Sequence, residues 1–297
     1  FLVAREPIEN FEWDMLKGKK VLGGRAGGMP EMVFEYILKQ YNMDPTGDLS
    51  IDQSIDFGST AAAFSGGQGD FTVEFEPHAT ALEQKGDGYV VASLGEESGY
   101  VPYTAFSAKK SYLEAHPDTV QAFVNALQRG MEKVSQSTPE EIAKMIALQF
   151  PETDEAVLTA IVRRYVEQDT WKTDLIFSED AFVLLQDILE EGGELTNRVA
   201  YEELVNTEFA KKALERCIVL KTAAKKSGDA GKIFRSLALF YSCNVDKMCA
   251  LQCSPDPIPN PVAGYPLLHL RDLLFRIGFG SFCHSRENQL VAVITVI

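Results

Sequence analysis

Three short stretches of the chain carry groups that could bind a small polar molecule. The first is the glycine loop GGRAGGMP, where the candidate residues are Arg25, Gly27, Gly28 and Met29. Unpaired backbone N–H groups at the start of a helix attract anions and polar groups, and Arg25 adds a positive charge nearby. The loop therefore predicts a seat for a small anionic or polar group. Glycines that only satisfy the geometry of an ordinary turn would give the same pattern.

The second and third stretches lie further along the chain. Ser59 and Thr60 follow a predicted strand and could offer hydroxyl and N–H donors, while Glu76 stands at the exit of the next strand. Tyr103 could stack on a ligand or hydrogen-bond to it. Each has a structural alternative: Ser59 as a helix cap, Glu76 as a partner of the following helix dipole, and Tyr103 as simple packing.

Alternating strands and helices must position these residues. Hydrophobic periodicity, with glycine or proline at the ends of the elements, predicts strands at 19–22, 49–55, 71–75 and 89–93. It predicts helices at 30–41, 60–64 and 77–84. The first helix should bury Val33, Phe34, Ile37, Leu38 and Tyr41. Such an alternation predicts a parallel or mixed sheet with helices on both faces, whose ligands gather where strand ends meet helix starts.

The chain becomes almost wholly helical after a further predicted strand at 103–108. Apolar residues repeat at helical spacing from Val120 to Val134, and the capping box TPEE predicts a helix that opens at Pro139. Thr153 and Ser178 are expected to cap two more helices, and residues 201–214 are expected to form one helix. The regular apolar stripes of this segment predict a packed core rather than a binding site.

Composition limits the classes of function. The 297 residues are 45% hydrophobic, which suffices for a folded core, and no apolar run of membrane-spanning length occurs. A net charge of −15 argues against nucleic acid as a partner, because phosphates would be repelled. The first residues contain neither an export signal nor an initiator Met, which predicts that the chain starts inside a longer protein.

The composition changes near residue 216. All five cysteines lie beyond it, and the part from Cys217 onward carries 9 Lys and Arg against 5 Asp and Glu, unlike the acidic body. Only one gap among Cys243, Cys249 and Cys253 suits a zinc site, so no metal or cofactor is predicted. Residues 216–297 are instead predicted to be a tail that is foreign to the domain or poorly ordered.

Three segments resemble a known family. They are LKGKKVLGGRAGGMPEMVFEYIL, DFGSTAAAFSGGQGDFTVEFEP and GYVPYTAFSAKKSYLEAHPDTVQAF, and they resemble the solute-binding proteins of ABC importers in the group for nitrate, sulfonates, taurine and thiamine-pyrimidine precursors. The resemblance covers residues 1–214. It implies an α/β, type II periplasmic-binding-protein-like fold, with one complete α/β lobe and the helical remainder of a second lobe. The implied parts are a crossing strand and linker at 1–13, the second α/β lobe at 14–103 and the helical part of the first lobe at 104–215.

The resemblance also implies a function. A protein of this kind captures a small polar or anionic solute between its lobes, acts outside the cytoplasm and delivers the solute to an ABC permease. It would act as a monomer, and the eight candidate residues would form one wall of its cleft. Family members begin with a segment, absent here, that builds most of the first lobe. The chain is therefore expected to be a fragment.

Two questions stay open at this point. Glu76 would suit a ligand that bears N–H groups, whereas Arg25 would suit an anion. An enzyme on the same fold, of the thiamine-pyrimidine or menaquinone biosynthesis type, is the alternative function, with His78 as its candidate base. A polar packing role for His78 is the simpler interpretation, and no nucleophile or phosphate loop accompanies it in the sequence.

Overall fold

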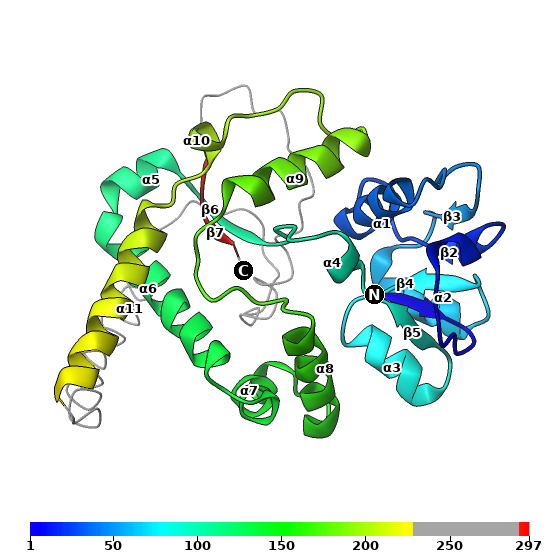
Figure 1. Cartoon of the computed structure of the whole chain (residues 1–297), viewed down its shortest axis with the longest axis horizontal. Coiled ribbons are helices and arrows are strands. Elements are labelled where there is room, and N and C mark those ends of the chain that lie inside the picture. The colour runs from blue at the N-terminus through cyan, green and yellow to red at the C-terminus, as the bar shows by residue number, and fades with distance from the viewer. Residues whose placement is uncertain (228–290, 297) are drawn as a thin grey trace, which may run out of the picture.

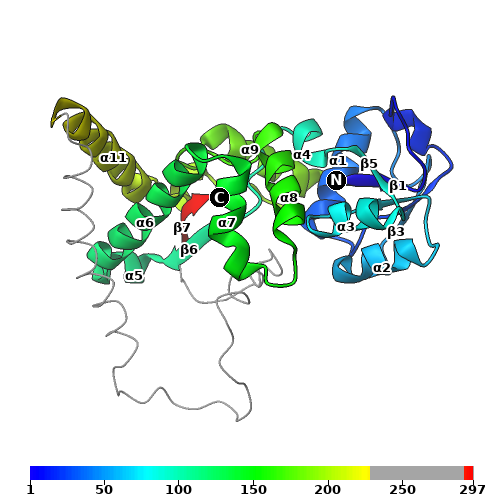
Figure 2. The ribbon, with the colours of Figure 1, turned by 90° about the horizontal axis from the view of Figure 1, so that it is seen from below.

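The computed structural model describes residues 1–227 and 291–296, which form two bodies joined by one connecting segment (Figure 1). We call the first body the α/β lobe; it holds β1 to β5 and α1 to α4. The second, which we call the helical segment, begins at β6. Figure 2 shows the two bodies lying end to end, with the α/β lobe at one end and α11 at the other.

A five-stranded sheet forms the centre of the α/β lobe. Its strands are β1 (Leu2–Ala4), β2 (Lys20–Leu22), β3 (Ser50–Asp52), β4 (Phe71–Val73) and β5 (Tyr89–Ala92). The spatial order is β3-β2-β4-β1-β5. β2 runs parallel to β3 and β4, whereas β1 runs antiparallel to β4 and β5. The prediction of a mixed sheet is confirmed. β4 stops at Val73, short of the predicted residue 75, because its neighbour β2 ends at Leu22.

Helices cover both faces of this sheet. They are α1 (Met29–Gln40), α2 (Thr60–Ser65), α3 (His78–Lys85) and α4 (Leu94–Glu97), with short 3-10 turns η1 (Trp13–Leu16) and η2 (Phe57–Ser59). On one face α1 buries Phe34, Ile37 and Leu38, as its periodicity predicts. On the other face Phe64 of α2 and Leu82 of α3 form a second cluster.

Tyr41 departs from the predicted buried stripe. It is the C-cap of α1 and has 47% of its surface exposed. Its ring stacks on Trp13 at 5.5 Å between centroids, and its hydroxyl donates to Glu97 at 2.6 Å. The helix ends at Gln40, so Tyr41 no longer follows the helical stripe that faces the core and packs along the surface of the lobe.

The helical segment contains one short sheet and seven helices in its described part. Its elements are β6 (Ala105–Lys109), α5 (Lys110–Ala115), α6 (Pro117–Ser135), α7 (Pro139–Ile146), η3 (Ala147–Gln149), α8 (Glu155–Glu167), α9 (Glu179–Glu191), α10 (Tyr201–Leu204), α11 (Glu208–Ser227) and β7 (Val291–Val296). The capping box of Thr138 and Glu141 is present, and Ser178 caps α9 by accepting from the Ala181 N–H at 3.3 Å. Both predictions are confirmed.

Two predictions about this segment are wrong. Asp154, not Thr153, is the N-cap of α8, because the Thr153 N–H is held by the Phe150 carbonyl in the preceding turn. Residues 201–214 form parts of two helices rather than one. The side chain of Asn206 accepts from the Glu208 N–H at 3.0 Å, which starts α11 as a new helix after the extended Val205.

The predicted tail boundary at residue 215 falls inside α11. The helix continues to Ser227, since this stretch is rich in helix-forming residues and reaches its first glycine at Gly228. Residues 291–296 form β7, which pairs antiparallel with β6. The rest of the predicted tail, including four of the five cysteines, lies outside the described residues.

The core of the α/β lobe gives a direct stability test. Phe34 is fully buried between α1 and the sheet, whereas Leu148 has 88% of its surface exposed. We expect Phe34→Ala to lower the free energy of unfolding by about 3–5 kcal/mol, because it removes packing and leaves a cavity. The control Leu148→Ala should change it by less than about 0.5 kcal/mol. Urea unfolding followed by circular dichroism measures both, and equal effects would contradict this assignment of the core.

Candidate functional site

The carboxyl ends of three neighbouring strands meet at one edge of the sheet, which we call the strand-end edge. β3, β2 and β4 are parallel, and Val21 lies opposite both Ile51 and Phe71. The three candidate stretches follow these three strand ends, so the fold gathers them as predicted. The first two loops also touch, because a Cβ added to Gly24 would lie 2.8 Å from the Phe57 ring.

The glycine loop is closed by its own hydrogen bonds. Gly27, with φ of +69°, donates its N–H to the Glu31 carboxylate at 3.2 Å, and Gly28 donates to the Arg25 carbonyl at 3.0 Å. A Cβ on Gly27 would lie 2.6 Å from the carboxylate of Glu194, an exposed side chain that can move aside, so it is the positive φ that favours glycine there. Both N–H groups predicted to face a solute therefore have partners within the chain.

The other two candidates of this loop differ in exposure. Met29 has 9% of its surface exposed and packs in the main core beside α9, while Arg25 is exposed. Met29 therefore faces the interior of the lobe. Arg25 is the one candidate of the glycine loop whose side chain reaches solvent.

Glu31 is a buried carboxylate that the sequence-based candidates did not include. It has 3% of its surface exposed and accepts from Gln53 at 2.7 Å as well as from Gly27. Burial, followed by the hydrogen bond and charge of Glu35, raises the pKa of Glu31 to about 7. The loop thus closes on a carboxylate and not on an external anion.

The second candidate stretch begins α2. Thr60 is fully buried, and its hydroxyl donates to the Phe57 carbonyl at 2.8 Å. Ser59 is exposed and is the N-cap of α2, but its side chain makes no capping hydrogen bond. The alternative that Ser59 acts as a side-chain cap is therefore wrong, whereas the Thr60 hydroxyl is bound within the turn.

Glu76 connects the two bodies of the chain. Its carboxylate accepts from the Thr80 N–H at 3.0 Å and the Thr80 hydroxyl at 2.9 Å, within α3. Arg164 of α8 donates to Glu76 at 2.6 Å and to Glu83 at 2.5 Å. The Glu76 side chain is only 1% exposed, so it is a buried ion-pair partner and not a free acceptor in an open cleft.

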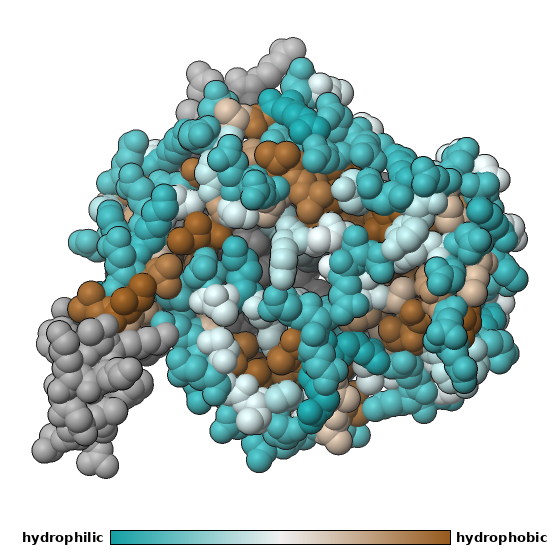
Figure 3. Space-filling view, in the orientation of Figure 1, coloured by the Kyte–Doolittle hydropathy of each residue, from teal (hydrophilic) through white to brown (hydrophobic). Residues whose placement is uncertain are grey.

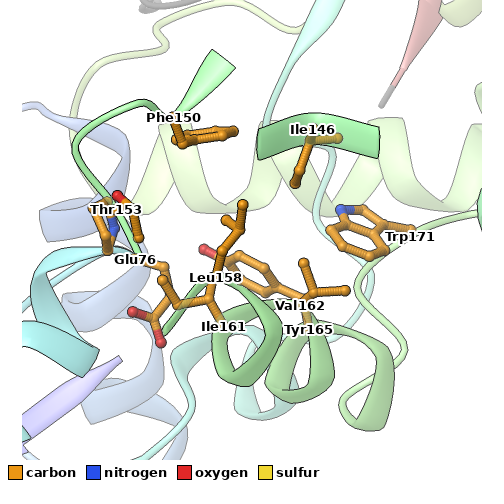
Figure 4. A pocket seen from close by; sticks show the side chains of 10 residues that line it. Glu76, Ile146, Phe150, Thr153, Leu158, Ile161, Val162, Tyr165 and Trp171 are labelled. Atoms are coloured by element: carbon orange, nitrogen blue, oxygen red, sulfur yellow. The ribbon is translucent and has the colours of Figure 1, made fainter. Parts of the chain in front are cut away.

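A small apolar cavity lies beside this ion pair. It has a volume of about 120 Å³ and is lined by Glu76, Pro77, Ile146, Phe150, Thr153, Leu158, Ile161, Val162, Tyr165 and Trp171. Figure 4 shows the Glu76 carboxylate at its margin and the α8 side chains across its floor. In Figure 3 apolar side chains also gather at α7 and α8, between α9 and α1, and along α11.

A histidine and a buried glutamate occupy the strand-end edge after β4. Glu74 is fully buried, and its Oε1 accepts from the Thr72 hydroxyl at 2.8 Å. Its Oε2 lies 3.8 Å from Nδ1 of His78, the first residue of α3. Glu74 was not among the candidates from the sequence, because it lies inside the segment FTVEF, which was predicted to be a strand. A carboxylate four residues before a histidine was the available signal.

Three aromatic rings follow one another beside this pair. The Phe57 and Phe75 rings lie 4.7 Å apart, and Phe75 and Tyr103 lie 5.2 Å apart, both edge to face. Phe75 and Tyr103 have 36% and 44% of their surface exposed. This aromatic row includes the predicted Tyr103 and gives the strand-end edge an open surface on which a flat molecule could pack.

In the part of the chain that the structure describes, no group of three or more His, Cys, Asp or Glu side chains could hold a metal ion. None of the helices described has both the length and the apolar character that crossing a membrane requires.

Sequence comparison finds a family that the region carrying these loops resembles. Residues 13–148 match the model of the NMT1-like family, so this part of the chain is similar to that family. Over 212 residues the chain is also 44% identical to YtlA of Bacillus subtilis strain 168, a protein named as a binding protein. That similarity covers 71% of this chain and 64% of YtlA.

Solved structures support the fold. The periplasmic sulfonate-binding protein SsuA of a sulfonate ABC transporter from Methylobacillus flagellatus KT superposes with a TM-score of 0.54 at 18% identity, over 73% of this chain and 66% of that one. The ligand-binding component of an ABC-type import system from Staphylococcus aureus gives 0.52 at 17% identity, over 71% and 69%. The chain therefore shares the fold of these two binding proteins, as the resemblance implies.

The pair of neighbouring arginines on α8 tests the join between the two bodies. Arg164 meets the buried Glu76, whereas Arg163 meets Glu140 with both side chains about half exposed. We expect Arg164→Met to lower the free energy of unfolding by about 2 kcal/mol, because it leaves the Glu76 carboxylate buried without its partner. Arg163→Met should cost less than about 0.5 kcal/mol. Chemical denaturation measures both, and similar losses would show that the join does not depend on Arg164.

Glu31 makes stability depend on pH. Its pKa is raised in the folded state, so the unfolded chain binds fewer protons and stability falls as pH rises from about 4.5 through 7. Glu31→Gln should therefore be the more stable form above pH 7, by on the order of 1–3 kcal/mol, with the difference shrinking towards pH 5. Unfolding at several pH values measures this, and a difference that grows on acidification would contradict it.

Proposed function

We propose that the chain is the solute-binding component of an ABC importer, that it works outside the cytoplasmic membrane, and that it hands a small solute to a membrane permease. The binding-protein name of YtlA and the ABC-import assignments of the two solved structures support this. The chain spans 64% of the length of YtlA, so the activity of the whole protein is part of the proposal.

The observation that carries the proposal is the strand-end edge itself. Three loops that are separate in the sequence converge there, and the exposed rings of Phe75 and Tyr103 border them. Ligands of open α/β sheets bind at the carboxyl ends of parallel strands. An exposed edge of this kind suits a protein whose solute is held between two bodies.

The charges at this edge favour a particular solute within the group of nitrate, sulfonates, taurine and thiamine-pyrimidine precursors. Gly27 and Gly28 already donate their N–H groups within the chain, and Arg164 is shared by two carboxylates. A bare oxyanion would find the exposed Arg25 but few free backbone donors, and three carboxylates lie buried beneath the edge. We therefore propose a flat solute that bears N–H groups, of the thiamine-pyrimidine kind.

A thermal-shift screen tests the proposed function. The full chain is heated with nitrate, ethanesulfonate, taurine and 4-aminopyrimidine, each over a concentration series. A solute present at about a hundred times its Kd should add about 2.7 kcal/mol of stability, a shift of several degrees in Tm. We expect 4-aminopyrimidine to give the largest shift.

Paired phenylalanine variants locate the site. Phe75→Ala should reduce the shift, because it opens the aromatic row, whereas Phe123→Ala on α6 should leave the shift unchanged. Phe123 is a fair control because it is 38% exposed against 36% for Phe75, and its ring also meets a neighbour edge to face. A screen in which no solute raises Tm, or in which both variants act alike, would count against the proposal.

A further inference from the structure

One oxygen of the buried Glu74 carboxylate lacks a hydrogen-bond partner among the described residues. Oε1 is held by Thr72, but Oε2 is buried without a hydrogen-bond partner, and Nδ1 of His78 lies 3.8 Å from it. The His78 side chain is 46% exposed while that of Glu74 is fully buried. The imidazole therefore stands between a buried carboxylate and the surface of the strand-end edge.

We propose that Glu74 and His78 form a recognition pair, in which Glu74 orients the imidazole through Nδ1 and His78 presents Nε2 to an N–H group of the solute. The inference rests on the proposed function and names the residues that would select its solute. Glu74 is the positioning residue, and His78 is the residue that contacts the solute.

The geometry of the imidazole explains the division of roles. Its two nitrogens lie on opposite sides of the ring, so an Nδ1 turned to the buried carboxylate leaves Nε2 towards the exposed side. A carboxylate that accepts from Nδ1–H fixes the tautomer in which Nε2 is bare. A bare Nε2 accepts a hydrogen bond, which suits a solute that donates one.

The proton content of the pair sets which solutes it can accept. Burial raises the pKa of Glu74 to about 7. When Glu74 takes up a proton, its O–H can donate to Nδ1, and the neutral imidazole then carries its own hydrogen on Nε2. The outward nitrogen changes from an acceptor to a donor. Binding of an N–H solute should therefore weaken as pH falls through about 7.

The remaining charged groups near the pair do not supply another acceptor. Glu76 and Arg164 are bonded to each other, and the amino group of Phe1 donates to the Glu74 backbone carbonyl at 2.8 Å. Phe75 follows Glu74 directly in the chain and belongs to the aromatic row. A flat ring that carries a positive or neutral N–H group is the class of solute that fits both features.

Two probes of the same shape test the inference. Benzamidine carries N–H donors on a flat ring, benzenesulfonate carries an oxyanion on one, and neither titrates between about pH 6 and 8. Calorimetric titration of the full chain should show benzamidine binding about tenfold more tightly at pH 8 than at pH 6, the change expected for one group titrating near 7. Benzenesulfonate should bind more weakly than benzamidine at pH 8.

Three variants separate the roles. His78→Gln should lower benzamidine affinity about tenfold at pH 8 and flatten its pH dependence. Glu74→Gln should also flatten the pH dependence, because the pair can no longer alternate between its two proton states. His116→Gln is the matched control, since His116 lies in the α5–α6 turn with its ring against Tyr112, and it should bind like the unmodified chain.

A measurement without a probe keeps the inference testable if Glu74→Gln does not fold. Nitrogen NMR of the unmodified chain at pH 8 should show His78 protonated at Nδ1, and His116 serves as the internal comparison. Nε2 protonation of His78 at pH 8 would overturn the pairing. If Glu74 only filled the core and did not bond to Nδ1, it would not select the Nδ1-protonated tautomer of His78.

The outcomes distinguish this inference from the proposed function. If benzenesulfonate binds more tightly than benzamidine, or if His78→Gln leaves benzamidine binding unchanged, the recognition pair is wrong while a solute-binding role stands. If neither probe binds, the named solute class is wrong, and the thermal-shift screen still decides whether the chain binds solutes at all.

Discussion

Parallel pairing of β2 with β3 and β4 is the constraint on which the arrangement of this chain depends. Parallel strands bring their carboxyl ends to one edge, and each crossover must then start its next element there. The glycine loop, the turn before α2 and the β4–α3 turn are neighbours for this reason alone. Their residues span positions 24 to 78 in the sequence, yet Gly24 touches Phe57, and Phe57 touches Phe75.

Three buried carboxylates crowd this edge, and each is stabilised in a different way. Glu31 accepts from a backbone N–H and an amide side chain, Glu74 from a threonine hydroxyl, and Glu76 from a helix start and an arginine. Burial raises the pKa of Glu31 and Glu74 to about 7. All three side chains lie beneath the edge, at which Arg25 of the glycine loop is exposed.

Arg164 links this edge to the rest of the molecule. It reaches from α8 to Glu83 of α3 and to Glu76 in the turn before α3. Its guanidinium also lies 5.3 Å from the Phe1 ring centroid. One residue of the helical segment thereby holds the same turn that carries Glu74 and His78. A change in how the two bodies meet would alter the position of that turn, because the Arg164–Glu76 ion pair is partly buried and requires a specific geometry.

Local patterns in the sequence determined the elements of the fold. The glycine loop, the capping box at Thr138 and the apolar stripe of α1 each depend on residues close together in the chain. The strands and helices could therefore be predicted, and the same local segments showed the resemblance to importer proteins. Tertiary contacts decided the rest. No local pattern shows that Gly28 donates to Arg25, that Met29 faces the core, or that Glu76 meets an arginine 88 positions away. Whether a donor is free or already bonded depends on partners distant in sequence, and for that reason the roles of Glu74 and His78 emerged only from the folded chain.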